Sequence, residues 1–163
     1  MGFRIVKITD LSGDGCKIYS VARDGSEDTL LESFIDEFDN DYTAQIDEIL
    51  NKLRFMGMEV GAREGFFRMN EGRPGDGVVA LLNAPGFPLR LYGIRFGTSL
   101  LILGSGGRKE RRIRSWQEDF KLRSAAEQMI KVSYLISRRV IDRVIVLKPD
   151  GTIEGNVYFE EVL

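Results

Sequence analysis

The chain has 163 residues, enough for one domain with a hydrophobic core that needs no cross-links. It contains no histidine and a single cysteine, which excludes an intramolecular disulfide, Cys/His zinc sites and every catalytic site that uses a histidine base. The N-terminal residues turn polar too early for a signal peptide, and no apolar run reaches the roughly 20 residues of a membrane helix. We therefore expect a cytoplasmic protein with no membrane contact.

The net charge of −2 hides a strong asymmetry along the sequence. Residues 1–88 carry 9 Lys/Arg and 16 Asp/Glu, residues 89–148 carry 14 and 5, and residues 149–163 carry 4 acids and no base. A local excess of positive charge of this size is typical of a phosphate-binding face. A solvated basic surface that balances the acidic first half is the more common explanation of such charge runs.

The first half of the chain predicts a hairpin followed by two helices. Apolar alternation indicates strands at 3–9 and 16–22, joined by a Gly/Asp turn. Ser26 precedes apolar residues at three- and four-residue spacing, which predicts an amphipathic helix. Asp41 can cap a second helix that ends near Gly57. The short connection between the two helices predicts that they are antiparallel.

The second half predicts a sheet, a long helix and a terminal hairpin. Strands are expected at 66–69, 78–82, 89–96 and 100–103, the last followed by a glycine turn at 104–107. Ser124 and Glu127 form a capping-box pattern for a helix that runs to about Val140. Strands at 143–147 and 153–159 flank a Lys-Pro-Asp-Gly turn.

These elements predict the fold class. We expect an α+β fold in which a twisted antiparallel sheet carries two N-terminal helices packed on it, with a C-terminal helix plus hairpin extension. The whole chain, residues 1–163, is expected to form a single domain.

Several motifs that suggest a ligand lack the required spacing. Gly104 to Gly107 follow a predicted strand, but the Walker pattern and its Lys-Ser/Thr ending are missing. The acidic residues at 36–41 lack the glycine and the final glutamate of an EF-hand loop. Cys16 lies in a predicted strand, where a cysteine is usually a small buried apolar residue. We therefore expect no metal and no cofactor.

Basic residues cluster on and after three of the predicted strands. Arg68 and Arg90 lie on two of them, and the adjacent Arg108 and Lys109 follow the last. Strand pairing would bring these side chains to the same end of the sheet. Guanidinium and ammonium groups can hold a phosphodiester and stabilise the extra charge of a pentacovalent transition state. Alternation places Arg95 on the face opposite Arg90, unless a β-bulge intervenes.

The order of elements, with L-R-L-Y at 89–92 and L-G-S-G-G-R-K-E-R at 103–111, resembles the RelE/HigB superfamily of toxin components, including phage-derived toxin-like proteins. The resemblance covers roughly residues 16–116. It implies a toxin-like core at 1–116 and leaves 117–163 as an extension. It also implies a metal-independent, ribosome-dependent endoribonuclease that cuts messenger RNA with the RNA's own 2′-hydroxyl, and an antitoxin protein as partner.

Carried over to this sequence, the resemblance assigns roles to two groups of residues. The catalytic, phosphate-stabilising group is Arg68, Arg90, Arg108 and Lys109. The RNA-binding group is Arg111, Arg112, Arg114 and Trp116. Family members often supply a Tyr or His near the C-terminus as acid or base, whereas this chain offers Trp116, which can stack on a base. Loss of a proton-transfer group typically costs roughly 10² to 10⁴ in rate.

Three interpretations of the basic cluster remain open. The first is an RNA-cleaving toxin-like enzyme, which needs a concave basic site with a proton donor. The second is a noncatalytic module that keeps the same fold and binds RNA or protein through residues 108–114. The third is a basic surface whose side chains form ion pairs with the acidic early helices.

Overall fold

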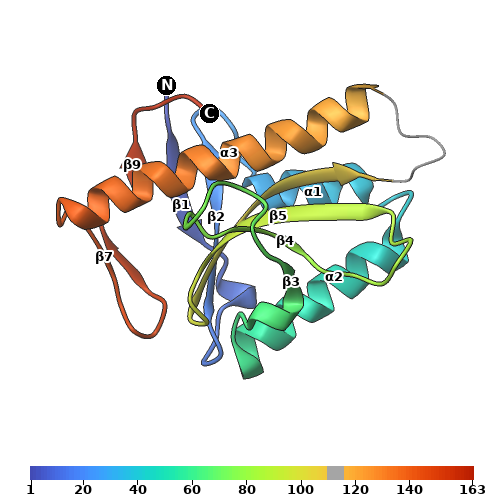
Figure 1. Ribbon diagram of the computed structural model, residues 1–163, viewed down its shortest axis with the longest axis horizontal. Coiled ribbons are helices and arrows are strands. Elements are labelled where there is room, and N and C mark those ends of the chain that lie inside the picture. Colours follow the sequence, from blue (N-terminus) through green and yellow to red (C-terminus); the bar gives the residue numbers. More distant parts are fainter. Residues whose placement is uncertain (110–115) are drawn as a thin grey trace.

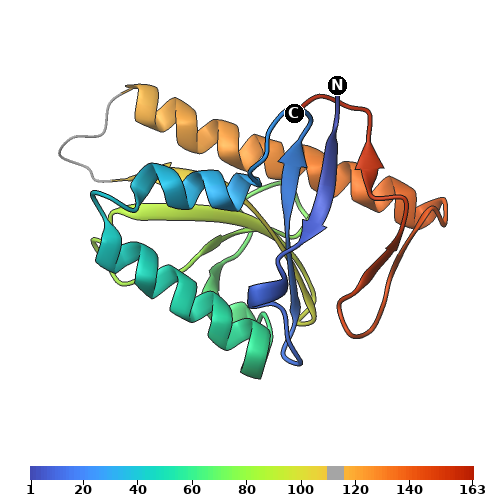
Figure 2. The ribbon, with the colours of Figure 1, turned by 180° about the vertical axis from the view of Figure 1, so that it is seen from behind.

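The computed structural model describes residues 1–109 and 116–163, and a seven-stranded sheet lies at its centre. The strand order is β3-β4-β5-β6-β2-β1-β9. Neighbouring strands are antiparallel except β2 and β6, which are parallel. One long helix, α3, crosses one face of the sheet (Figure 1), and the shorter α1 and α2 lie on the other (Figure 2). The predicted α+β class is confirmed.

The chain begins with the predicted hairpin. β1 (Phe3–Lys7) and β2 (Lys17–Arg23) pair antiparallel, with Phe3 opposite Arg23. A short 3-10 turn at Thr9–Leu11 lies in the connection between them.

α1 (Leu30–Phe38) begins at a different cap from the predicted one. Thr29 Oγ1 accepts from the backbone N–H of Glu32, and the Glu32 carboxylate accepts from the N–H of Thr29, which makes a capping box. Ser26 lies three residues before this cap and does not cap the helix, because the bridge between Thr29 and Ala22 of β2 delays the start of the helix to Leu30.

α2 (Thr43–Phe55) differs from the prediction at its start. Its N-cap is Tyr42, without a side-chain cap, because the Tyr42 N–H already donates to Phe38 in the tight connection from α1; Asp41 is therefore not the cap. The α-helix ends at Phe55, close to the predicted end near Gly57, and is followed directly by a π-helical turn, Met56–Val60. Gly61, at φ +82°, ends it.

Four strands follow α2. They are β3 (Phe67–Arg68), β4 (Val78–Leu81), β5 (Leu89–Phe96) and β6 (Leu100–Arg108). The predicted turn at 104–107 is wrong, because these residues continue β6. Close approach explains the glycines: a Cβ on Gly106 would lie 1.8 Å from the carbonyl oxygen of Arg90, and one on Gly104 would overlap the side chain of Met129.

The C-terminal part holds the remaining elements. They are α3 (Trp116–Ile141), β7 (Ile145–Leu147), β8 (Ile153–Gly155) and β9 (Tyr158–Phe159). Ser124 and Glu127 lie inside α3 and do not cap it, because the residues before them are good helix formers and Leu122 packs against the sheet. The strand predicted at 153–159 is two strands: β8 pairs with β7, and after Gly155 (φ +110°) β9 pairs with β1.

The core has two halves, one on each face of the sheet. Phe34 and Ile49 of the first two helices pack with Leu91 on one face. Met129 and Val132 of α3 pack with other strand residues on the opposite face. α3 therefore packs on the sheet that β1 to β6 form, and β9 extends that sheet beside β1. Within residues 1–109 and 116–163, no helix is both long and apolar enough to cross a membrane.

Candidate functional site

The register of β5 and β6 separates two of the predicted catalytic residues. Arg90 pairs with Gly107, and Leu89 pairs with Arg108, so Arg90 and Arg108 lie on opposite faces of the sheet. Between Leu91 and Gly93 the register shifts, so that one residue of β5 faces two residues of β6. Because of this bulge, the residues of β6 after it face the side of the sheet opposite to the one that uninterrupted alternation would give them. The two arginines share an end of the sheet but not a face.

Arg108 is engaged by the protein itself. Its Nη2 donates to Glu118 Oε1 of α3 at 2.5 Å, and its side chain also hydrogen-bonds to Tyr42 at the start of α2. The Glu118 carboxylate first, and then Tyr42, hold the pKa of Arg108 above its ordinary value. Arg108 therefore links β6 to both helix layers and is not available as a phosphate ligand beside Arg90.

Lys109 is the basic residue that stays with Arg90. Its backbone N–H donates to the Pro88 carbonyl at 2.8 Å, which extends the ladder by one residue beyond Arg108. Lys109 thus follows Gly107 by two positions, on the face of Arg90, and such diagonal neighbours have Cα atoms about 7–8 Å apart. Arg90 is half-buried, and its guanidinium forms no hydrogen bond or ion pair with any residue that the structure describes.

Arg68 lies on the same face but at a distance. It pairs with Ala80, which pairs with Tyr92, so the three residues form a row across β3, β4 and β5. Arg68 is two strands and two residues away from Arg90, which places their Cα atoms roughly 12 Å apart. Its Nε lies 3.8 Å from Oε1 of the half-buried Glu71, a long ion pair on an exposed arginine, and such a pair is weak. Arg68 can therefore exchange Glu71 for another anion.

Tyr92 is a residue to which the sequence analysis assigned no role. It follows Arg90 by two positions on the same face, and its side chain is 6% exposed. Its hydroxyl forms no hydrogen bond with the residues that the structure describes. The Arg-x-Tyr alternation was the available signal. Tyr92 brings an exchangeable proton to the strand that carries Arg90.

The other predicted residues fall into two groups. Arg111, Arg112 and Arg114 lie outside the described residues, and Trp116 opens α3 without a described side chain. Arg95 lies on the α2 side, as alternation predicted: its Nε donates to the Ala62 carbonyl at 2.6 Å.

Part of the basic half does pair with the acidic early helices. Lys121 of α3 forms an ion pair with Glu37 of α1, and its ammonium lies 5.0 Å from the ring centroid of Phe38. For Lys121, this ion pair agrees with the interpretation of the basic cluster as a surface paired with the acidic early helices. It does not account for Arg90, whose guanidinium has no partner among residues 1–109 and 116–163.

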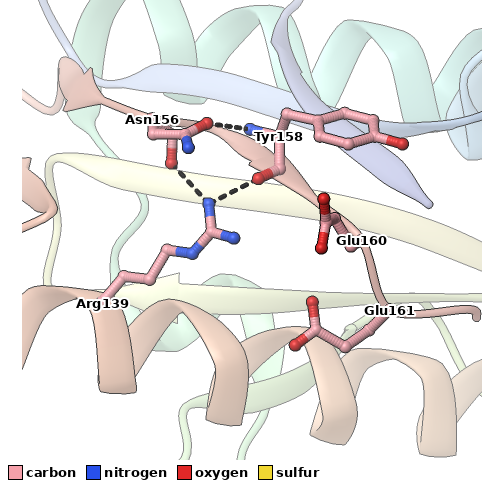
Figure 3. A pocket seen from close by; sticks show the side chains of 5 residues that line it. All are labelled: Arg139, Asn156, Tyr158, Glu160 and Glu161. Atoms are coloured by element: carbon pink, nitrogen blue, oxygen red, sulfur yellow. Dashed lines mark hydrogen bonds between the residues drawn. The ribbon is translucent and has the colours of Figure 1, made fainter.

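A cavity of about 510 Å³ near the C-terminus is a structural junction (Figure 3). Arg139 of α3 donates from Nη1 to the carbonyls of Asn156 and Tyr158, at 2.8 and 2.5 Å, and its guanidinium stacks 3.8 Å from the ring centroid of Phe159. Arg139 thereby fixes β9 to α3. Because its hydrogen bonds go to the backbone, this cavity is a weaker candidate than the face of Arg90.

Cys16 is buried, as predicted, and burial raises the pKa of its thiol to about 11. Over the described parts of the chain, no three His, Cys, Asp or Glu side chains gather as a candidate metal site. The thiol therefore has the properties of a core side chain and not of a nucleophile.

Comparisons with known protein families, with curated proteins and with solved structures find no match to this chain.

Proposed function

We propose that this chain is a RelE/HigB-like protein that binds single-stranded RNA on the α3 side of β3, β4 and β5. The observation that carries the proposal is that Arg90, which pairs with Gly107, has Lys109 two positions beyond that partner, with Arg68 farther along the same face. A phosphate at Arg90 would gain the bidentate hydrogen bonds that a guanidinium without protein partners can offer. Lys109 would add a second positive charge on the same side.

Affinity for RNA tests this proposal directly. A fluorescent single-stranded RNA of about twelve nucleotides would be titrated with the full chain and followed by anisotropy at several salt concentrations, since an OB-fold-sized site covers about 4–16 nucleotides. The Arg90→Ala/Lys109→Ala variant should bind more weakly, and each lost phosphate contact should reduce the slope of log K against log salt by about 0.7.

The control for this titration is Arg54→Ala, which removes an exposed arginine of α2 on the opposite side of the sheet. It should bind RNA as the wild type does. Equal affinity of the wild type and the Arg90→Ala/Lys109→Ala variant would overturn the proposal, and so would a wild-type chain that does not bind.

Cleavage of messenger RNA on the ribosome is a second candidate function, favoured by Tyr92 beside Arg90. In this reaction the RNA 2′-oxygen attacks the adjacent phosphorus and gives up its proton to water, and the P–O5′ bond breaks to leave a 2′,3′-cyclic phosphate. Arg90 and Lys109 stabilise the added negative charge, and the phenol of Tyr92 donates a proton to the departing 5′-oxygen. An antitoxin partner would then be expected to cover this face.

Expression in a growing bacterium, with growth and messenger RNA followed together, separates the two candidates. Cleavage by the wild type alone supports the nuclease. Tyr92→Phe removes only the hydroxyl and should lower the cleavage rate by roughly 10² to 10⁴ if Tyr92 transfers the proton. Intact RNA in cells, together with Arg90-dependent binding in vitro, would leave the noncatalytic RNA-binding module.

A further inference from the structure

A second cavity lies between the middle of α3 and the connection from β3 to β4. Figure 1 shows this connection as the green loop next to α3. The volume of the cavity is about 590 Å³, within the range of about 300–1,000 Å³ that is usual for small-molecule sites. Arg73 and Asp76 line it from the connection, and Glu127, Lys131 and Tyr134 line it from α3. The cavity is on the α3 side of the sheet, the side that carries Arg68 and Arg90.

The walls of this cavity are held together by hydrogen bonds. Ser133 of α3 is 1% exposed, and its hydroxyl donates to the backbone carbonyl of Asp76 at 2.5 Å. The Asp76 carboxylate accepts from the backbone N–H groups of Arg73 and Val78, at 2.7 and 3.0 Å. The connection is therefore fixed to the helix before any ligand binds. The Asp76 carboxylate is already hydrogen-bonded to backbone N–H groups of its own connection.

The remaining groups around the cavity fit the parts of a nucleotide. Tyr134 is 62% exposed, and an exposed ring is a platform on which a base can stack. The Arg73 side chain has no hydrogen-bond or ion-pair partner in the described part of the chain, and the Lys131 ammonium bonds to the carbonyl of Val162, which leaves its charge unneutralised. Both cations can hold a phosphate, and the exposed Glu127 carboxylate can accept from an exocyclic amine.

We propose that this cavity binds one nucleotide, with its base stacked on Tyr134, its phosphate held by Arg73 and Lys131, and its exocyclic amine directed to Glu127. The amine favours cytosine and adenine over uracil. This inference rests on the proposed function, because the nucleotide is taken to be part of the RNA strand that binds there. A strand of RNA held at Arg90 and Lys109 would pass Arg68 and place a later nucleotide here.

The test is isothermal titration calorimetry of the full chain with cytidine 5′-monophosphate. The wild type should bind it, and Tyr134→Ala should weaken binding roughly 5- to 150-fold, the usual loss for one base–aromatic stack. Arg73→Ala should weaken binding of the monophosphate and leave binding of cytidine unchanged, because only the phosphate contact is lost. Uridine 5′-monophosphate should bind more weakly than cytidine 5′-monophosphate to the wild type, and equally in Glu127→Gln.

Arg54→Ala serves as the matched control for loss of an exposed arginine, and circular dichroism checks the fold of each variant. No binding of cytidine 5′-monophosphate, or equal binding by the wild type and Tyr134→Ala, would overturn the nucleotide site. If RNA binding still depends on Arg90 and Lys109 in that case, the proposed function stands without this site. If the monophosphate binds through Tyr134 while the RNA does not bind, the site is supported for a free nucleotide and the proposed function fails.

Discussion

Replacing Gly57 with alanine should destabilise the fold, because two backbone segments meet at this glycine. A Cβ at Gly57 would lie 1.7 Å from the carbonyl oxygen of Leu11 and 3.5 Å from Ile18 Cδ1. The Gly57 carbonyl also accepts from the N–H groups of Gly15 and Cys16, at 2.8 and 3.1 Å. The first contact is with backbone, so relief requires the hairpin connection to move away from the π-helical turn.

The expected loss follows from what that movement breaks. Each of the two hydrogen bonds contributes about 1 kcal/mol, and partial exposure of the buried Leu11 removes about 1.5 kcal/mol more. Alanine offsets about 1 kcal/mol through its higher helix propensity. The free energy of unfolding should therefore fall by about 2–3 kcal/mol, measured by urea unfolding followed by circular dichroism.

Gly65→Ala is the matched control, because a Cβ there would meet nothing within 4 Å. Its free energy of unfolding should stay within about 0.5 kcal/mol of the wild type. The reasoning about Gly57 is refuted if the two variants unfold at the same urea concentration with equal slopes.

Three further predictions concern residues that the structure places in defined contacts. Arg108→Met should lower the Tm because the ion pair between Arg108 and Glu118 is lost, while RNA affinity should change by less than about twofold, in contrast to Arg90→Met. Ser133→Ala should cost about 1–3 kcal/mol in urea unfolding, because the bond to Asp76 is lost inside the fold. Cys16 favours its neutral form when folded, with a pKa raised from 9.0 to about 11, so its contribution to stability is complete below pH 9 and is lost as pH rises to 11.

Each of these has a result that contradicts it. If Arg108→Met loses as much RNA affinity as Arg90→Met, Arg108 contributes to RNA binding and the prediction is wrong. Unchanged urea unfolding of Ser133→Ala would mean that the connection is not held by that hydroxyl. For Cys16, the comparison is with Cys16→Ala: the wild type should lose more stability between pH 9 and 11, and parallel curves would show that the thiol does not titrate differently in the fold.

Local patterns predicted most of the elements because they depend on neighbouring residues. Alternation was enough for the first hairpin and for β5, and apolar residues at helical spacing were enough for α1 and α2. The ends of elements were less predictable. Ser26 and Thr29 are both good N-caps, and the pairing of Thr29 with Ala22 of β2 decides between them. Likewise, Gly104 to Gly107 suggest a turn in isolation, whereas their close contacts with α3 and β5 keep them in β6.

The order of residues alone places positive charge around β5 and the end of β6, because charge along a chain does not depend on how the chain folds. The sequence also determined that no histidine could take part in any reaction. Which basic residues share a face of the sheet depends on strand register, which exists only in the folded chain. The bulge opposite Tyr92 places an extra residue in β6, which directs Arg108 to Glu118 and Tyr42 and leaves Lys109 with Arg90. Alternation along one strand cannot reveal such a bulge, because the extra residue is defined by the partner strand.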